Sequence, residues 1–122
     1  MDETPLYERL GGRAGVTAVV EEAIAGHFAN PAVKVRFEHV ADRRDGLTAH
    51  AVEFFCTGLS GVETYTGRPM AEAHAGMNID DREFVAVLDD IMEALVDCAV
   101  DERERVEVLG ILYGMKGDVV HR

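Results

Sequence analysis

The chain has 122 residues, of which 48% are hydrophobic and 29% are charged, which predicts one soluble globular domain over residues 1–122. Its formal net charge is −11, from 23 acidic and 12 basic residues. This balance argues against binding to nucleic acid or to an anionic membrane surface, because both are recognised by clusters of Lys and Arg.

The first half of the chain carries helical patterns. Thr4-Pro5 can start a helix, with Thr as the cap and Pro at the first helical position, and Gly11-Gly12 interrupts it. From Arg13 to about Ala29 the apolar positions recur in steps of three and one, as on one face of a helix. These positions are Val16, Val19, Val20, Ala23, Ile24, His27 and Phe28. Asn30-Pro31 ends this helix, since Pro disfavours helical geometry in the residue before it.

A short segment over 33–37 is ambiguous. Val33, Val35 and Phe37 alternate as in a strand, but the segment is short and follows a Pro, so a turn of helix is an equal alternative. The helical pattern returns from about Asp45 to Leu59, and Ser60-Gly61 closes it.

The second half of the chain also carries helical patterns. Residues 61–67 are predicted to form a loop and 69–75 a short helix that Gly76 interrupts. Asp80 can cap a helix that extends to about Leu95. Asp101 and Glu104 resemble a capping box in front of a last helix over 106–113. The chain is therefore predicted to be all-α, with four substantial helices.

Few residues outside the histidines suggest chemistry. The chain lacks a phosphate-binding glycine motif, a GxSxG nucleophile elbow and an HExxH zinc motif. Asp80-Asp81 and Asp89-Asp90 are adjacent pairs that diverge on a helix, which favours solvated carboxylates. Cys56 and Cys98 stand far apart in apolar surroundings, which predicts buried thiols in a reducing cytoplasm. The N-terminus shows no secretory signal.

The five histidines divide into two groups. His39 and His121 lie among polar or terminal residues, which predicts a surface position. His27, His50 and His74 fall on or near apolar stripes. A histidine there is more often a hydrogen-bonded core residue than a metal ligand, so spacing alone does not separate these two interpretations.

Several segments follow one another in a specific order and spacing. They are Leu6–Gly12, Phe54–Cys56, Leu59–Gly61, Tyr65–Met70, Ala73-His74, Met77–Ile79, Phe84 and Gly117–Val120. Over nearly the whole chain this pattern resembles the group I truncated haemoglobin family. The resemblance implies an all-α truncated globin, a two-over-two helical sandwich that encloses haem. It also implies haem b bound without a covalent link.

The resemblance places His74 at the family's proximal position, where a neutral imidazole is a good ligand for the haem iron. It also implies a set of residues that line the haem. They are Ile24, Phe37, Leu47, Ala51, Phe54, Arg68, Met70, Met77, Phe84, Leu88 and Ile91. Arg68 can pair with a haem propionate, and a plain surface arginine is the equal alternative.

The distal side departs from the family. Ile24 stands where the family usually places a tyrosine, and Ala23 stands where an aromatic residue is usual. Leu47 and Ala51 occupy positions that are commonly polar. A donor there stabilises the negative charge on bound O2, so the hydrogen bonds that support tight O2 binding and NO dioxygenation have no predicted counterpart.

His50 is the main polar candidate on that side; His27, a turn from Ile24, is a weaker one, for which a core position is favoured. His50 aligns with a position that supplies a sixth iron ligand in cyanobacterial members of the family. Two interpretations are equally open: a bis-histidine iron between His74 and His50, or His50 at the haem edge. Those relatives can attach haem through a C-terminal histidine, but the matching place here is near Met115, and His121 lies beyond it.

Three functions follow as hypotheses. The first is a cytoplasmic haem protein that binds O2, CO or NO, for oxygen binding and transport, as a monomer or weak dimer with a reductase as a further partner. NO dioxygenase or peroxidase-like activity is left open. The second is a haem redox protein for electrons, NO or peroxide. The third is a haem-free helical interaction module.

Overall fold

A computed structural model of the chain describes residues 4–38, 40–59 and 74–121. Regular structure in these residues is helical apart from a parallel β-bridge between Ile79 and Val120. The elements are α1 (Leu6–Arg9), α2 (Gly12–Ala29), α3 (Lys34–Glu38), the 3-10 turn η1 (Ala41–Arg43), α4 (Arg44–Gly58), α6 (Asp81–Asp97), α7 (Glu102–Tyr113) and α8 (Lys116–Val119). No helix within these ranges has the length and apolar character needed to cross a membrane.

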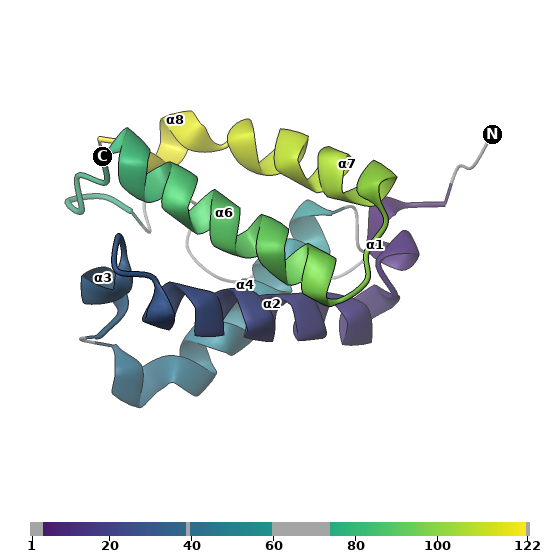
Figure 1. Cartoon of the computed structure of the whole chain (residues 1–122), viewed down its shortest axis with the longest axis horizontal. Helices are drawn as coiled ribbons and strands as arrows, with labels where there is room; N and C mark the ends of the chain where they lie inside the picture. Colours follow the sequence, from purple (N-terminus) through teal and green to yellow (C-terminus); the bar gives the residue numbers. More distant parts are fainter. Residues whose placement is uncertain (1–3, 39, 60–73, 122) are drawn as a thin grey trace.

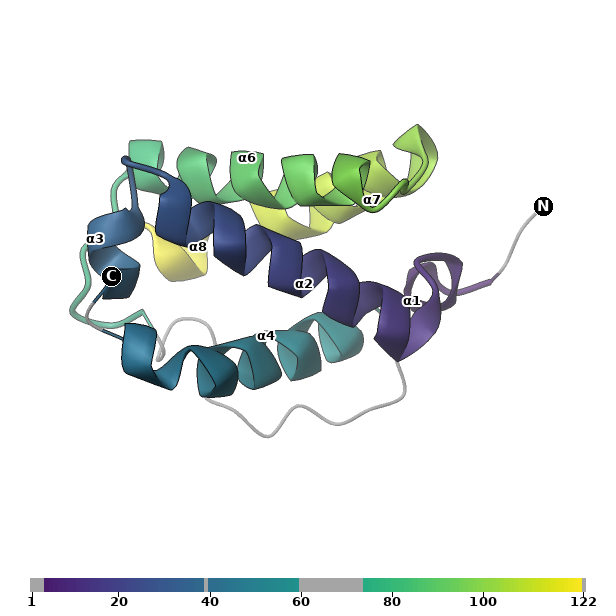
Figure 2. The same cartoon turned by 60° about the horizontal axis from the view of Figure 1, so that its bottom comes forward.

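The long helices form two layers. Helices α6 and α7 lie side by side in one layer, and α2 and α4 form the other (Figure 1). Helix α2 packs against both α4 and α6, so it joins the layers, and α4 lies on the far side of α2 from α6 and α7 (Figure 2). This is the predicted two-over-two helical sandwich.

Local sequence signals explain most of the helix boundaries. Asp80 caps α6 by accepting a hydrogen bond from the backbone N–H of Glu83, whose side chain in turn accepts from the N–H of Asp80. The ambiguous segment after Pro31 is helix α3 rather than a strand. Local bonds begin this helix, since the backbone N–H of Lys34 donates to the carbonyl of Asn30 at 2.8 Å.

Two predicted caps and one predicted thiol position are wrong. Asp101 is the N-cap residue of α7 but forms no side-chain cap, because the Glu104 carboxylate instead accepts from Arg9 at 3.1 Å. Helix α1 begins at Leu6 after Pro5, without a side-chain cap from Thr4. Cys56 is buried as predicted, whereas Cys98 is partly exposed. The loop over 61–67 and most of the helix over 69–75 lie outside the described residues.

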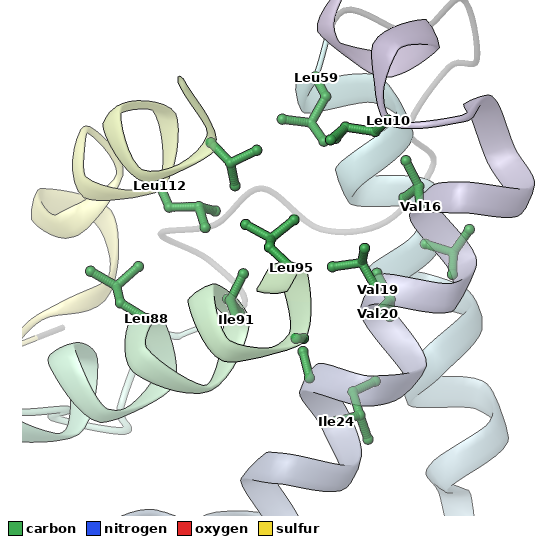
Figure 3. Close-up of a cluster of buried hydrophobic side chains, with 14 of the residues drawn as sticks. Leu10, Val16, Val19, Val20, Ile24, Leu59, Leu88, Ile91, Leu95 and Leu112 are labelled. Carbon is green, nitrogen blue, oxygen red and sulfur yellow. The ribbon is translucent and has the colours of Figure 1, made fainter. Parts of the chain in front are cut away.

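The two layers share one apolar core. Leu95 on α6 lies between Val19 and Val20 on α2 and Leu112 on α7 (Figure 3). Leu95 is 1% exposed, which makes it one of the most deeply buried side chains described. Because α2, α6 and α7 all contribute to this contact, the helices are held together mainly by apolar burial.

Replacing Leu95 by Ala is expected to lower the free energy of unfolding by about 3 kcal/mol, through lost burial and the cavity left behind. Urea denaturation followed by far-UV circular dichroism measures the change. Val96 is the matched control, because it is the next residue of α6 and is 56% exposed. Val96→Ala should change the value by less than about 0.5 kcal/mol. Equal losses in the two variants would contradict the assigned orientation of α6.

Candidate functional site

The described residues of the predicted pocket come from four helices and one turn. On α6 and α2 they are buried: Phe84, Leu88, Ile91 and Ile24. On α4, α3 and the turn after His74 they are half-buried: Leu47, Ala51, Phe54, Phe37 and Met77. Arg68 and Met70 lie outside the described residues. The fold thus gathers apolar side chains that are up to 67 positions apart in sequence (24 to 91).

These residues fit a flat, apolar cofactor such as haem. Leu47 and Ala51 on α4 pack against the core cluster, to which Leu88 and Ile91 on α6 belong. Because α4 and α6 belong to different layers (Figure 2), the apolar residues predicted to line the site come from both layers. Half-burial of the α4 residues leaves apolar surface that a hydrophobic ring can cover.

His74 lies on a short turn that leads into α6. The backbone N–H of Met77 donates to the carbonyl of His74 at 3.1 Å, which closes the turn. Gly76 follows with φ +83°, a left-handed conformation that glycine adopts at low cost. The imidazole is half-buried. The imidazole of a histidine is a suitable iron ligand, so the donor chemistry also fits haem.

The residues predicted for the distal side lie on two helices. Ile24 is buried on α2, and Leu47 and Ala51 are half-buried on α4. His50 lies on the same helix as Leu47, three residues later, and it is exposed.

Only part of a buried polar cluster near this site was predicted from the sequence. His27 was predicted to be a core residue, and it is 6% exposed. Its Nδ1 lies 2.8 Å from the Asp90 carboxylate, which also accepts two hydrogen bonds of 3.1 Å from Asn30. The prediction that Asp90 is solvated is therefore wrong. The His27 ring also stacks on Phe37, with ring centroids 5.0 Å apart.

His27 is expected to make the protein acid-sensitive. Burial lowers the pKa of His27 from its usual 6.5, although the hydrogen bond and the charge of Asp90 act in the opposite direction. The unfolded chain therefore takes up a proton near pH 6.5 while the folded chain does not. It follows that the free energy of unfolding falls as the pH drops below about 6.5.

Urea-unfolding midpoints at pH 7.5 and pH 5.5 measure this effect. The difference between the two midpoints should be smaller in His27→Gln than in the unmodified protein, because Gln does not titrate. His121→Gln removes an exposed histidine and serves as the control. An equal pH dependence in all three proteins would show that His27 titrates as it does in the unfolded chain.

Comparisons with known proteins agree with this fold. The model of the bacterial-like globin family matches residues 5–121. A group 1 truncated haemoglobin from Mycolicibacterium paratuberculosis is 31% identical over 114 residues, which cover 93% of this chain and 82% of the relative. A group 1 truncated haemoglobin from Nostoc commune is 28% identical over 120 residues, with 96% and 98% covered.

Solved structures show the same architecture. The truncated haemoglobin of Tetrahymena pyriformis in its Fe(III) form has a TM-score of 0.92 at 26% identity, covering 98% of this chain and 100% of that one. A 2/2 haemoglobin from Synechococcus, solved in the cyanomet state with covalently attached haem, has a TM-score of 0.89 at 26% identity with the same coverage.

Proposed function

The chain belongs to the bacterial-like globin family and is a group 1 truncated haemoglobin, and from this premise we propose that it binds O2, CO or NO at a haem iron ligated by His74. Haem b is the cofactor, and we propose that the protein binds it without a covalent bond. The observation that carries the proposal is the half-buried His74 on its closed turn, within a chain that matches the family over residues 5–121. We also propose that the protein binds gas in the cytoplasm, as a monomer or weak dimer. A reductase is its proposed partner.

The haem, when bound, supplies an iron at which diatomic gases bind reversibly. His74 would hold the iron through its imidazole. The apolar side chains of α6 and α4 cover the ring and exclude water, and Phe37 contributes from α3. Arg68 is proposed to meet a propionate and Met70 to line the pocket. His121, which approaches the side-chain oxygen of Asn78 through its Nδ1 at 3.3 Å, has a partner other than haem.

The apolar distal side supports easily reversible gas binding. Ile24, Leu47 and Ala51 cannot donate a hydrogen bond to a gas ligand, so such a ligand is held mainly by the iron. The same feature favours a second candidate function, a haem redox protein in which His50 occupies the sixth position. NO or peroxide chemistry belongs to this second candidate.

Gas-binding kinetics test the proposed function. Haemin is titrated into the full chain, and the complex is reduced and mixed with O2 or CO in a stopped-flow spectrometer. One haem per chain and reversible complexes with both gases are expected. A chain that retains no haem would contradict the proposal and favour a haem-free interaction module. A haem complex that transfers electrons but binds neither gas would favour the redox candidate.

Replacing His50 by Ala tests the sixth ligand. If His50 binds the iron, this variant should change a low-spin ferrous spectrum to a high-spin one, and CO binding should become faster because no internal ligand must leave. Absorption spectroscopy and stopped-flow mixing with CO measure the two effects. His39→Ala removes another histidine as the control. An unchanged spectrum and an unchanged rate would place His50 off the iron.

A further inference from the structure

We propose that Arg36 is a positioning residue for His74, because its guanidinium ties the turn that carries His74 to helix α3. This role rests on the proposed function, since it concerns the ligand of the haem iron. Helix α3, the segment over 74–80 and α8 lie at the same end of the molecule in both views (Figures 1 and 2). Arg36 joins the first two of these parts.

All three nitrogens of the Arg36 guanidinium group are engaged. Nε and Nη2 donate to the two oxygens of the Glu83 carboxylate at 2.5 and 2.8 Å, and Nη1 donates to the backbone carbonyl of Met77 at 2.7 Å. The side chains of Arg36 and Glu83 are 31% and 19% exposed, so water screens the pair less than it would on an open surface. The Arg36 hydrogen bond lowers the pKa of Glu83, which keeps the carboxylate charged.

Met77 connects this bond to His74. Its N–H donates to the His74 carbonyl, while its own carbonyl accepts from Arg36. The next residue, Asn78, has φ +48°, a left-handed conformation that Asn adopts more readily than most other non-glycine residues. The hydrogen bond from Met77 to His74 thus closes the turn that carries His74, and the hydrogen bond from Arg36 to Met77 anchors this turn to α3.

The far end of the segment is anchored as well. Glu83 accepts from the N–H of Asp80 in the capping box of α6, and the carbonyl of Ile79 accepts from the N–H of His121 at 2.8 Å. Arg36 therefore binds both the turn, at the Met77 carbonyl, and the first turn of α6, at Glu83. Because Phe37 follows Arg36 directly, this tether also links the His74 turn to a predicted haem contact from α3. Loss of Arg36 should make the turn that carries His74 more mobile while leaving the apolar core intact.

Four variants separate the effect of the Arg36 bonds from other effects. Arg36→Ala removes both contacts. Glu83→Gln keeps the capping box, since Gln also serves at that position, but it loses the charge that binds Arg36. Lys116→Ala is the matched control, because Lys116 pairs with Asp81 at 3.0 Å near the same helix start, and that pair is separate from the bonds that Arg36 donates to Glu83 and Met77. Arg36→Lys keeps the charge but cannot bind both acceptors in the same fork geometry.

Two measurements decide the proposal. Hydrogen exchange of the full chain as purified should be about 10-fold faster over residues 74–80 in Arg36→Ala, less so in Glu83→Gln, and unchanged in Lys116→Ala. In the reduced haem complex, the iron–histidine stretching band in resonance Raman spectra should shift or broaden in the same order, with Arg36→Lys giving only partial rescue.

Unchanged exchange and an unchanged band in both Arg36→Ala and Glu83→Gln would overturn the proposal, and so would equal changes in Lys116→Ala. The exchange experiment does not depend on haem. If the chain held no haem, the proposed function would fail, whereas faster exchange over 74–80 would still support the tether.

Discussion

Replacing His74 by Ala is expected to lower the affinity for haem by at least about 100-fold, more than the loss of an outer partner of a metal ligand costs. The reason is that the iron would lose its proposed protein ligand, and the side chains predicted to cover the ring are apolar. Haem transfer to an excess of apomyoglobin, followed by absorption spectroscopy, measures the affinity and the rate of haem loss.

Free imidazole distinguishes a lost ligand from a lost fold. Added imidazole should restore a histidine-ligated spectrum in His74→Ala, because it can occupy the space of the missing ring. His121→Ala removes an exposed histidine and should retain haem like the unmodified protein. If His74→Ala kept its haem with an unaltered spectrum, another residue would be the proximal ligand.

Replacing Ile24 by Tyr is expected to slow O2 dissociation by about 10- to 100-fold, the range that corresponds to one hydrogen bond to a charged group. Ile24 is buried on α2 at the position where the family usually places a tyrosine. A hydroxyl there can donate to the partial negative charge on bound O2. CO carries less charge, so its dissociation should change less. Stopped-flow replacement of O2 by CO measures the rate.

Ile24→Phe is the matched control, because it introduces nearly the same ring volume without the hydroxyl. Both variants add volume to a packed core and should lose similar stability. If Ile24→Phe slowed O2 dissociation as much as Ile24→Tyr, the effect would come from steric crowding. If neither variant changed the rate, Ile24 would not face the gas-binding side of the haem.

Apolar periodicity and local capping signals predicted the helices well, because both depend on residues that are close together in sequence. The apolar stripe from Val16 to Phe28 corresponds to α2, and the Asp80 cap corresponds to the start of α6. The segment after Pro31 stayed ambiguous from sequence, since five residues are too few to distinguish a strand from a turn of helix by period.

Long-range polar contacts could not be predicted in the same way. Asp90 is 63 positions from His27, and Arg36 is 47 positions from Glu83. Nothing in the local sequence shows that the folded chain brings these groups together. Glu104 illustrates the same limit, because its carboxylate binds Arg9, 95 positions away, rather than closing a capping box. The one usable signal was His27 on an apolar stripe, which predicted burial but not its partner.

The candidate site could be predicted further than these contacts because its residues match a family in order and spacing. Ile24, Phe84 and Leu88 are buried, as expected for residues that line the pocket. Their contact with haem, and that of His50 and Arg68, stays a prediction.

The most direct test is the visible absorption spectrum of the haem-reconstituted chain, recorded in the ferric form, after reduction with dithionite, and after addition of CO. Gas binding at a His74-ligated iron predicts a Soret band that shifts on reduction and again with CO. A high-spin ferrous spectrum that responds to CO at once would place His50 off the iron, and a low-spin spectrum with slow CO binding would place it on the iron. Absence of a Soret band would contradict the account.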